Sequence, residues 1–127
     1  MIRRLVFGIL VLALTMGHDH GGCDSPGAPT GAECDPRIRW DNFGSEFMTK
    51  YCTGCHSTAV SGGQRRGAPD DHNFDTLAGV QKDLEHIDAA TASGPAAHNT
   101  YMPPYGPLPT DDEREQLGRW VACGAPD

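Results

Sequence analysis

The run Cys52-Thr53-Gly54-Cys55-His56 constrains the fold of this chain more than any other feature. A Cys-x-x-Cys-His pattern is typical of covalent haem attachment. Two intervening residues place both sulfurs on one face of a helical turn, where each thiol can add to a neighbouring vinyl group of a porphyrin. The histidine that follows can then ligate the iron. The motif therefore predicts one haem, held by Cys52 and Cys55 and ligated by His56.

Two other kinds of site contain a Cys-x-x-Cys pair, and both fit this sequence poorly. A structural zinc site requires two further Cys or His ligands at close spacing, and none follows this pair. A thioredoxin-like redox pair belongs in a βαβ unit, for which the sequence gives no pattern. Haem attachment is the preferred interpretation.

Composition predicts a single small domain with a thin apolar core. The chain has 127 residues, of which 38% are hydrophobic, with 16 Gly and 10 Pro. A buried haem would supply much of the missing apolar interior. The formal net charge of −7 argues against a nucleic-acid partner and favours a partner with a positive docking face. A need for solubility explains the same charge equally well.

The first part of the chain is interpreted as an export signal followed by a linker. Residues 1–17 combine Arg3 and Arg4 with an apolar run too short to span a bilayer, which is typical of a signal peptide. Residues 18–37 are rich in Gly, Pro, Asp and Ser and predict a flexible linker. Within this linker, Cys23 follows two glycines and could carry a lipid anchor, although the residue three positions before it is not aliphatic.

Three amphipathic segments predict helices over 41–51, 76–89 and 111–123. The first carries apolar side chains at helical spacing, with Asp41 as the expected N-cap. The second has one apolar stripe, formed by Leu77, Val80, Leu84 and Ile87. The third begins with a capping box between Thr110 and Glu113, and its apolar face is Leu117, Trp120 and Val121.

Two segments without helical period carry further candidate residues. The polar loop 57–71 contains Arg65 and Arg66, which could neutralise haem propionates or simply be solvated. The segment 91–109 is long for a loop in a compact domain, and such loops are usually functional. It contains Met102 followed by two prolines, which would fix the backbone beside a thioether.

Together these residues resemble the class I cytochrome c family, in its small bacterial monohaem form. The resemblance covers about residues 38–124, and it rests on the motif at 52–56, on Met102-Pro103-Pro104 before the last helix, and on Gly44 ahead of the motif. It implies axial ligation of the iron by His56 and Met102, and a glycine–aromatic contact between Gly44 and Trp120. It also implies that the Pro69 carbonyl accepts the second N–H of the haem histidine.

Other residues could take the sixth position of the iron. His98 lies in the same loop as Met102, and His72, His86 and Met48 are further options. The resemblance favours Met102, and its thioether would raise the redox potential relative to a second imidazole.

The three remaining cysteines are Cys23, Cys34 and Cys123. Covalent haem attachment of this family takes place outside the bacterial cytoplasm, where disulfides persist. Because the first and last helices cross in the resembled fold, a Cys34–Cys123 bridge is implied, which leaves Cys23 single. A Cys23–Cys34 bridge remains the alternative.

The sequence thus predicts an all-α domain of three or more helices over residues 38–127, wrapped around one covalently bound haem c. The resemblance implies a periplasmic, monomeric electron carrier rather than an enzyme. A lipid anchor on Cys23 is an open alternative to a free form. Two alternatives stay open, namely a haem enzyme or gas sensor with an open sixth site, and a haem subunit bound permanently to a larger oxidoreductase.

Overall fold

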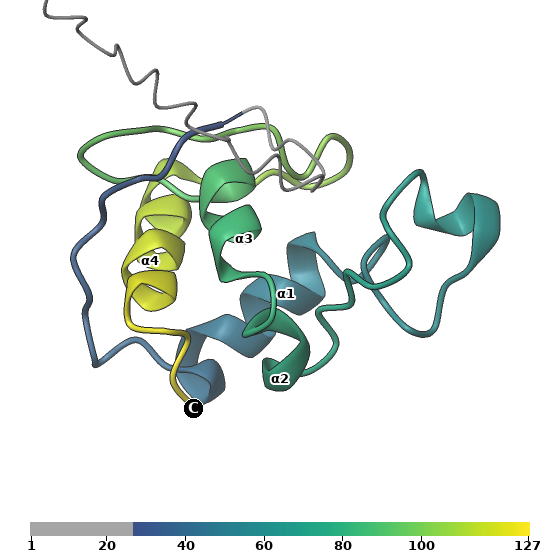
Figure 1. The fold of residues 1–127 in the computed structure, drawn as a ribbon, viewed down its shortest axis with the longest axis horizontal. Coiled ribbons are helices and arrows are strands. Elements are labelled where there is room, and N and C mark those ends of the chain that lie inside the picture. Colours follow the sequence, from purple (N-terminus) through teal and green to yellow (C-terminus); the bar gives the residue numbers. More distant parts are fainter. Residues whose placement is uncertain (1–26) are drawn as a thin grey trace, which may run out of the picture.

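The computed structural model describes residues 27–127, and this part of the chain is helical. Its elements, shown in Figure 1, are η1 (Trp40–Gly44), α1 (Ser45–Tyr51), η2 (Gly62–Arg65), α2 (Leu77–Val80), α3 (Leu84–Thr91) and α4 (Asp111–Ala122). Residues 27–127 contain no β-strand, only an isolated bridge between Ser93 and His98. The predicted all-α class is therefore confirmed. The expected signal peptide and the expected lipid anchor at Cys23 fall on residues 1–26, outside the described residues.

The first helix covers the predicted segment but begins with a π-helical turn. η1 runs directly into α1, and the residue that caps η1 is Arg39 rather than the expected Asp41. Asn42 stabilises this start, because its side chain accepts a bond of 2.8 Å from the Arg39 N–H. The first helix then ends at Tyr51, directly before the Cys-x-x-Cys-His motif.

The helix predicted over 76–89 is wrong as one element, because the structure breaks it into α2 and α3. The amides of Lys82 and Asp83 bond three residues back, to Gly79 and Val80, which closes α2 with a tight turn. The Gln81 side chain donates to the carbonyl of Ala125 near the C-terminus, at 2.9 Å. These tertiary contacts interrupt the helix without moving its apolar stripe, since Val80 and Ile87 are both buried.

The last helix, α4, forms as predicted. The Thr110 hydroxyl accepts from the Glu113 N–H, and the Glu113 carboxylate accepts from the Thr110 N–H. This capping box satisfies two amides that would otherwise lack partners. The helix ends before Gly124, whose positive φ of 80° favours glycine.

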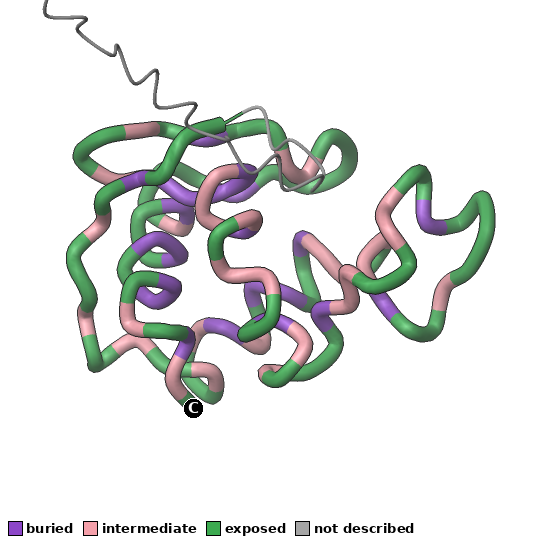
Figure 2. Tube along the Cα trace, in the orientation of Figure 1, coloured by how far each residue is buried: buried purple, intermediate pink, exposed green. Residues whose placement is uncertain are grey.

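The core lies where α4 meets the first helix and α3. α3 packs against α4, and buried residues recur along the inward sides of these helices (Figures 1 and 2). Trp120 is fully buried at the crossing with the first helix. Its indole contacts Gly44, where a Cβ would lie within 2.6 Å of the Trp120 Cη2 atom. The buried apolar residues of this core are Phe47, Met48, Tyr51, Phe74, Val80, Ile87, Ala92, Leu117, Trp120, Val121 and Ala125.

The second half of the predicted linker is a packed part of the domain, which corrects the boundary placed at residue 38. Thr30 is 1% exposed, and its hydroxyl and its amide both donate to the Asp88 carboxylate, at 2.6 and 2.8 Å. Asn99 exchanges hydrogen bonds with the backbone of Ala28. The sequence could not predict these bonds, because small polar residues indicate a loop both when the segment is solvated and when it packs on the domain.

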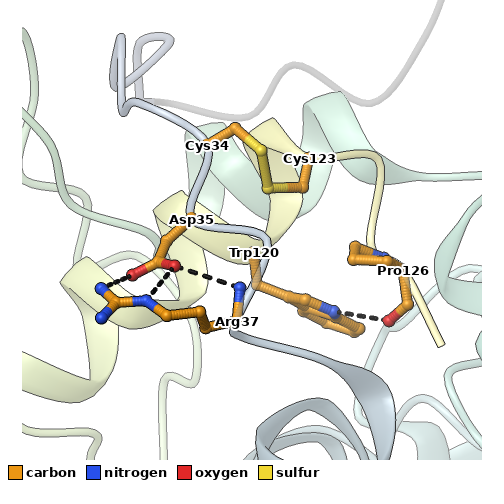
Figure 3. The surroundings of a disulfide bond; sticks show 6 residues. All are labelled: Cys34, Asp35, Arg37, Trp120, Cys123 and Pro126. Atoms are coloured by element: carbon orange, nitrogen blue, oxygen red, sulfur yellow. Dashed lines mark hydrogen bonds and ion pairs between the residues drawn. A yellow bond between two sulfur atoms is a disulfide. The ribbon is translucent and has the colours of Figure 1, made fainter.

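A disulfide joins Cys34 to Cys123 across 89 residues of sequence, the pairing that the resemblance implied. Figure 3 shows this bridge beside Trp120, whose indole N–H donates to the Pro126 carbonyl at 3.1 Å. Asp35 follows Cys34 and forms an ion pair with Arg37. The bridge thus fixes the segment before the first helix to the end of α4.

No helix among residues 27–127 has the length and the hydropathy needed to cross a bilayer.

Candidate functional site

A cavity of about 1040 Å³ lies between the first helix, α3, and the loops that follow α1 and α3. Its wall includes Cys52, Cys55 and His56 from the motif, and Met102 from the loop between α3 and α4. This volume is at the upper end of the usual range for ligand pockets, which is roughly 300–1,000 Å³. The cavity therefore has room for a large organic ligand and brings the expected attachment and ligating residues to one space.

The motif forms a hydrogen-bonded turn directly after the first helix. The amides of Cys55 and His56 both donate to the Cys52 carbonyl, at 3.1 and 2.9 Å. Both cysteines are free thiols, so they are not consumed by a disulfide. Burial raises the pKa of the Cys52 thiol to about 12, which keeps it protonated at neutral pH.

The imidazole of His56 is held in one orientation. Its Nδ1 lies 3.2 Å from the carbonyl of His72, and Phe74 stacks on the ring with centroids 4.9 Å apart. A carbonyl can only accept, so Nδ1 carries the proton and the Nε2 lone pair is left for a metal. Burial lowers the pKa of His56, which favours the neutral form that metals require.

The carbonyl partner of His56 corrects the role implied for Pro69. Pro69 does line the cavity, but its carbonyl accepts a hydrogen bond from the Arg65 guanidinium instead. His72 was considered only as an iron ligand, and Phe74 was not considered at all. Their contacts with His56 were not foreseen, because they depend on how the loop folds back. The Phe74 amide, for example, donates to the carbonyl of His56 at 2.9 Å.

Arg65 is an organiser of the loop rather than a free charge. The residue is only 4% exposed, although it was expected as a surface group near haem propionates. Its five N–H groups are used by backbone carbonyls and one amide oxygen, so none is left for a propionate. These acceptors are Ser57, Ala68, Pro69, His72 and the Asn73 side chain, while the Val60 carbonyl and the Asp70 carboxylate each lie 3.5 Å from the guanidinium.

Arg66 differs from its neighbour because it is exposed. Its guanidinium lies over the Tyr105 ring, 5.4 Å from the centroid, and both residues line the cavity. A positive charge at this edge can still meet an anionic ligand group. The expectation of a propionate contact therefore stays a prediction for Arg66, whereas the structure contradicts it for Arg65.

Met102 is half-buried on the cavity wall, in a loop fixed on both sides of the residue. Its amide donates to the Ala90 carbonyl at 2.8 Å, and its own carbonyl accepts from Arg114 at 3.0 Å. The same Arg114 nitrogen also lies within hydrogen-bond distance of the carbonyls of Thr91 and Asn99. Sequence reasoning missed Arg114. A cation near the N-terminus of a helix is unfavourable with the helix dipole, so its position there was the available sign of a structural role.

The alternatives for the sixth ligand separate by position. His98 does not line the cavity; its Nδ1 lies 2.6 Å from the Ser93 hydroxyl and its Nε2 lies 3.6 Å from Asp111. Met48 is 1% exposed within the core, where its sulfur is not presented to the cavity. His72 and His86 do line the cavity, so geometry leaves them in contention with Met102.

The donors gathered here are two thiols, an imidazole nitrogen and a thioether, all on a largely apolar wall. Imidazole and soft sulfur ligands suit iron in a haem. The residues present therefore fit a haem attached through Cys52 and Cys55. No protein-family model, curated protein or solved structure matches this chain. The resemblance to class I cytochromes c thus rests on the residues and motifs themselves.

Proposed function

We propose that this protein is a small monohaem c-type cytochrome that carries single electrons between redox partners. The observation that carries the proposal is one cavity walled by Cys52, Cys55, His56 and Met102. Free thiols at this spacing beside a neutral, oriented histidine serve haem attachment better than any other chemistry of these groups.

Each residue has a defined task in this proposal. The haem iron, when bound, supplies a reversible change between the ferrous and ferric states. His56 presents Nε2 to the iron, because its Nδ1–H is donated to the His72 carbonyl. Met102 offers its thioether from a backbone held by Ala90 and Arg114. Buried apolar walls such as Phe74 and Leu117 limit water around the iron.

With both axial positions taken by the protein, no position remains for a substrate, which suits a carrier rather than an enzyme. The acidic chain favours a partner with a positive docking face. The motif and the signal-like residues 1–17 together favour export to the periplasm. The protein would act there as a monomer, either free or anchored through a lipid on Cys23.

The test is the absorption spectrum of the protein purified from a host that attaches haem c. We expect one covalently bound haem, a low-spin spectrum in both redox states, and a weak near-infrared band in the ferric protein. Met102→Ala should abolish that band, because the band reports sulfur ligation. His98→Ala should leave it unchanged, since His98 lies off the cavity.

Two results would contradict the proposal. A chain without covalent haem would end the cytochrome interpretation altogether. A high-spin spectrum, or rapid binding of carbon monoxide by the unmutated protein, would instead support the haem enzyme or gas sensor with an open sixth site.

A further inference from the structure

We propose that His72, Asp83 and His86 form a second metal site, which binds a divalent transition-metal ion such as zinc. One ligand atom from each residue can be chosen so that all three lie within 4.8 Å of one another. His72 Nε2 lies 3.7 Å from Asp83 Oδ1, and His86 Nδ1 lies 3.8 Å from the same oxygen. The two rings lie with their centroids 5.4 Å apart.

The cluster is assembled by the break between α2 and α3. Asp83 precedes α3 as its N-cap residue and lies one helical turn before His86. His72 reaches the same point from the loop before α2. The apolar stripe predicted one continuous helix over 76–89, and the structure interrupts it. The interruption at 81–83 gives Asp83 a non-helical backbone and brings its carboxylate between the two imidazoles.

The metal-binding atoms of the three side chains are not engaged in hydrogen bonds. Within residues 27–127, no hydrogen bond engages the Asp83 carboxylate or either imidazole ring. The Asp83 side chain makes no capping bond to α3, although it occupies the capping position. His72 and Asp83 are each 14% exposed at the side chain, so they meet in a partly desolvated place. A metal ion would satisfy all three groups at once.

The donor set selects the class of ion. Two imidazoles and one carboxylate suit zinc and related divalent transition metals, and three protein ligands leave a fourth position for water. Zinc bonds of about 2.0–2.2 Å place tetrahedral ligand atoms roughly 3.4 Å apart. The two shorter separations already approach that value, and the 42% exposed side chain of His86 can rotate to close the third.

The imidazole of His72 also lines the haem cavity, but the contact that orients His56 is made by the His72 backbone carbonyl. The backbone carbonyl of His72 faces His56, whereas its imidazole faces Asp83. A metal on the imidazole therefore leaves the carbonyl free to hold the haem histidine. The rings of His56 and His72 are 6.3 Å apart between centroids, so the second metal would lie close to the first.

The test is zinc binding by isothermal titration calorimetry at neutral pH, with untagged, full-length protein in which Cys52 and Cys55 are replaced by serine. These two replacements remove the free thiols that would otherwise bind zinc themselves. We expect one saturable site per chain. Asp83→Asn and His86→Ala should each raise the Kd at least about tenfold, since even outer-shell substitutions at metal sites reach that loss. Asp83→Asn removes no capping bond, so its fold, checked by circular dichroism, should persist.

Two controls separate this site from other histidines. His98→Ala removes a histidine that also faces a carboxylate, that of Asp111, but has no second imidazole beside it among residues 27–127. This variant should bind zinc as the protein with only the serine replacements does. A His18→Ala, His20→Ala double variant should do the same. Zinc binding retained by Asp83→Asn and His86→Ala, or absent from the protein with only the serine replacements, would overturn the proposal. Haem is counted separately by absorption, so either proposal can fail without the other.

Discussion

Gly44 allows the first helix and α4 to approach closely because it has no side chain. It is buried where the first helix crosses α4, directly against the Trp120 indole. Phe43 meets the same indole edge-on, with centroids 6.2 Å apart, and Trp40 stacks on it at 6.1 Å. The indole is therefore enclosed on several sides and cannot retreat from an added methyl group.

We expect Gly44→Ala to lower the free energy of unfolding by about 1–3 kcal/mol through overpacking. Helix propensity alone predicts the opposite, a gain of roughly 0.5–1 kcal/mol. Guanidinium denaturation at neutral pH measures the difference. Gly63→Ala is the control, because a Cβ at Gly63 meets no atom within 4 Å. A stabilised Gly44→Ala protein would show that the two helices can move apart.

Arg65 shows why some single residues could not be assigned from the sequence. An arginine in a polar loop is usually solvated, and nothing in the neighbouring sequence marks this one as buried. Its role depends on carbonyls from residues 57–73 that converge only after the loop has folded back. Gly44 and Trp120 were easier, because their contact was implied by the family that the motif resembles.

At the scale of elements, Glu113 ties the start of α4 to the end of α1. Its carboxylate completes the capping box with Thr110 and also accepts from the Tyr51 hydroxyl at 2.8 Å. Lys50 lies 3.3 Å from the same carboxylate. The bond from the Thr110 amide is the main reason that the pKa of Glu113 falls to about 2. Protonation of this one group would weaken the cap and the contact between helices together.

We expect Glu113→Gln to cost about 1–2 kcal/mol at neutral pH, the usual range for a lost charged cap. The carboxyl has a pKa of about 2 in the folded protein and 4.5 as its ordinary value. Its stabilisation is therefore complete above pH 4.5 and disappears as the pH falls toward 2. Urea denaturation of both proteins across this window should show the two stabilities converging. A constant difference would mean that the charge of Glu113 is not what stabilises the contact.

The elements differ in how well sequence patterns predict them. α4 was predicted closely because a capping box, an apolar face and a terminal glycine all lie within the helix or directly beside it. The break between α2 and α3 was not predicted, because the contact of Gln81 with the distant Ala125 carbonyl is not visible in the local sequence. Periodicity reports which face is buried, and this survived the break, but it does not report where a tertiary contact interrupts a helix.

At the scale of the whole molecule, the Cys34–Cys123 bridge closes most of the domain into one loop. Replacing both cysteines by serine should lower the free energy of unfolding by about 2–5 kcal/mol, since the unfolded chain regains conformational freedom. Neither residue lines the cavity, so the absorption spectrum should stay unchanged. Thermal denaturation and spectra of the double variant test both points. Asp35→Asn, which removes only an ion pair beside the bridge, should change stability far less.

The overall arrangement was only partly open to prediction. The motif predicted the residues of one side of the cavity, and the resemblance implied that Met102 also faces the haem. The packing of residues 27–37 onto α3 and its following loop was not foreseen, because the linker composition of this segment is compatible with either state. The partner of His56 was also misplaced, from Pro69 to His72, since two carbonyls a few residues apart in one loop look alike in sequence.

The two cysteine pairs have a consequence for how the protein is made. An oxidising compartment tends to join any thiols that meet, and exchange between pairs proceeds through the thiolate. In the folded chain Cys34 and Cys123 are bound to each other, and the raised pKa of Cys52 keeps almost no thiolate there. Folding therefore keeps the two cysteine pairs apart. Cys34 and Cys123 are joined as a disulfide, and the protonated Cys52 thiol undergoes thiol–disulfide exchange slowly.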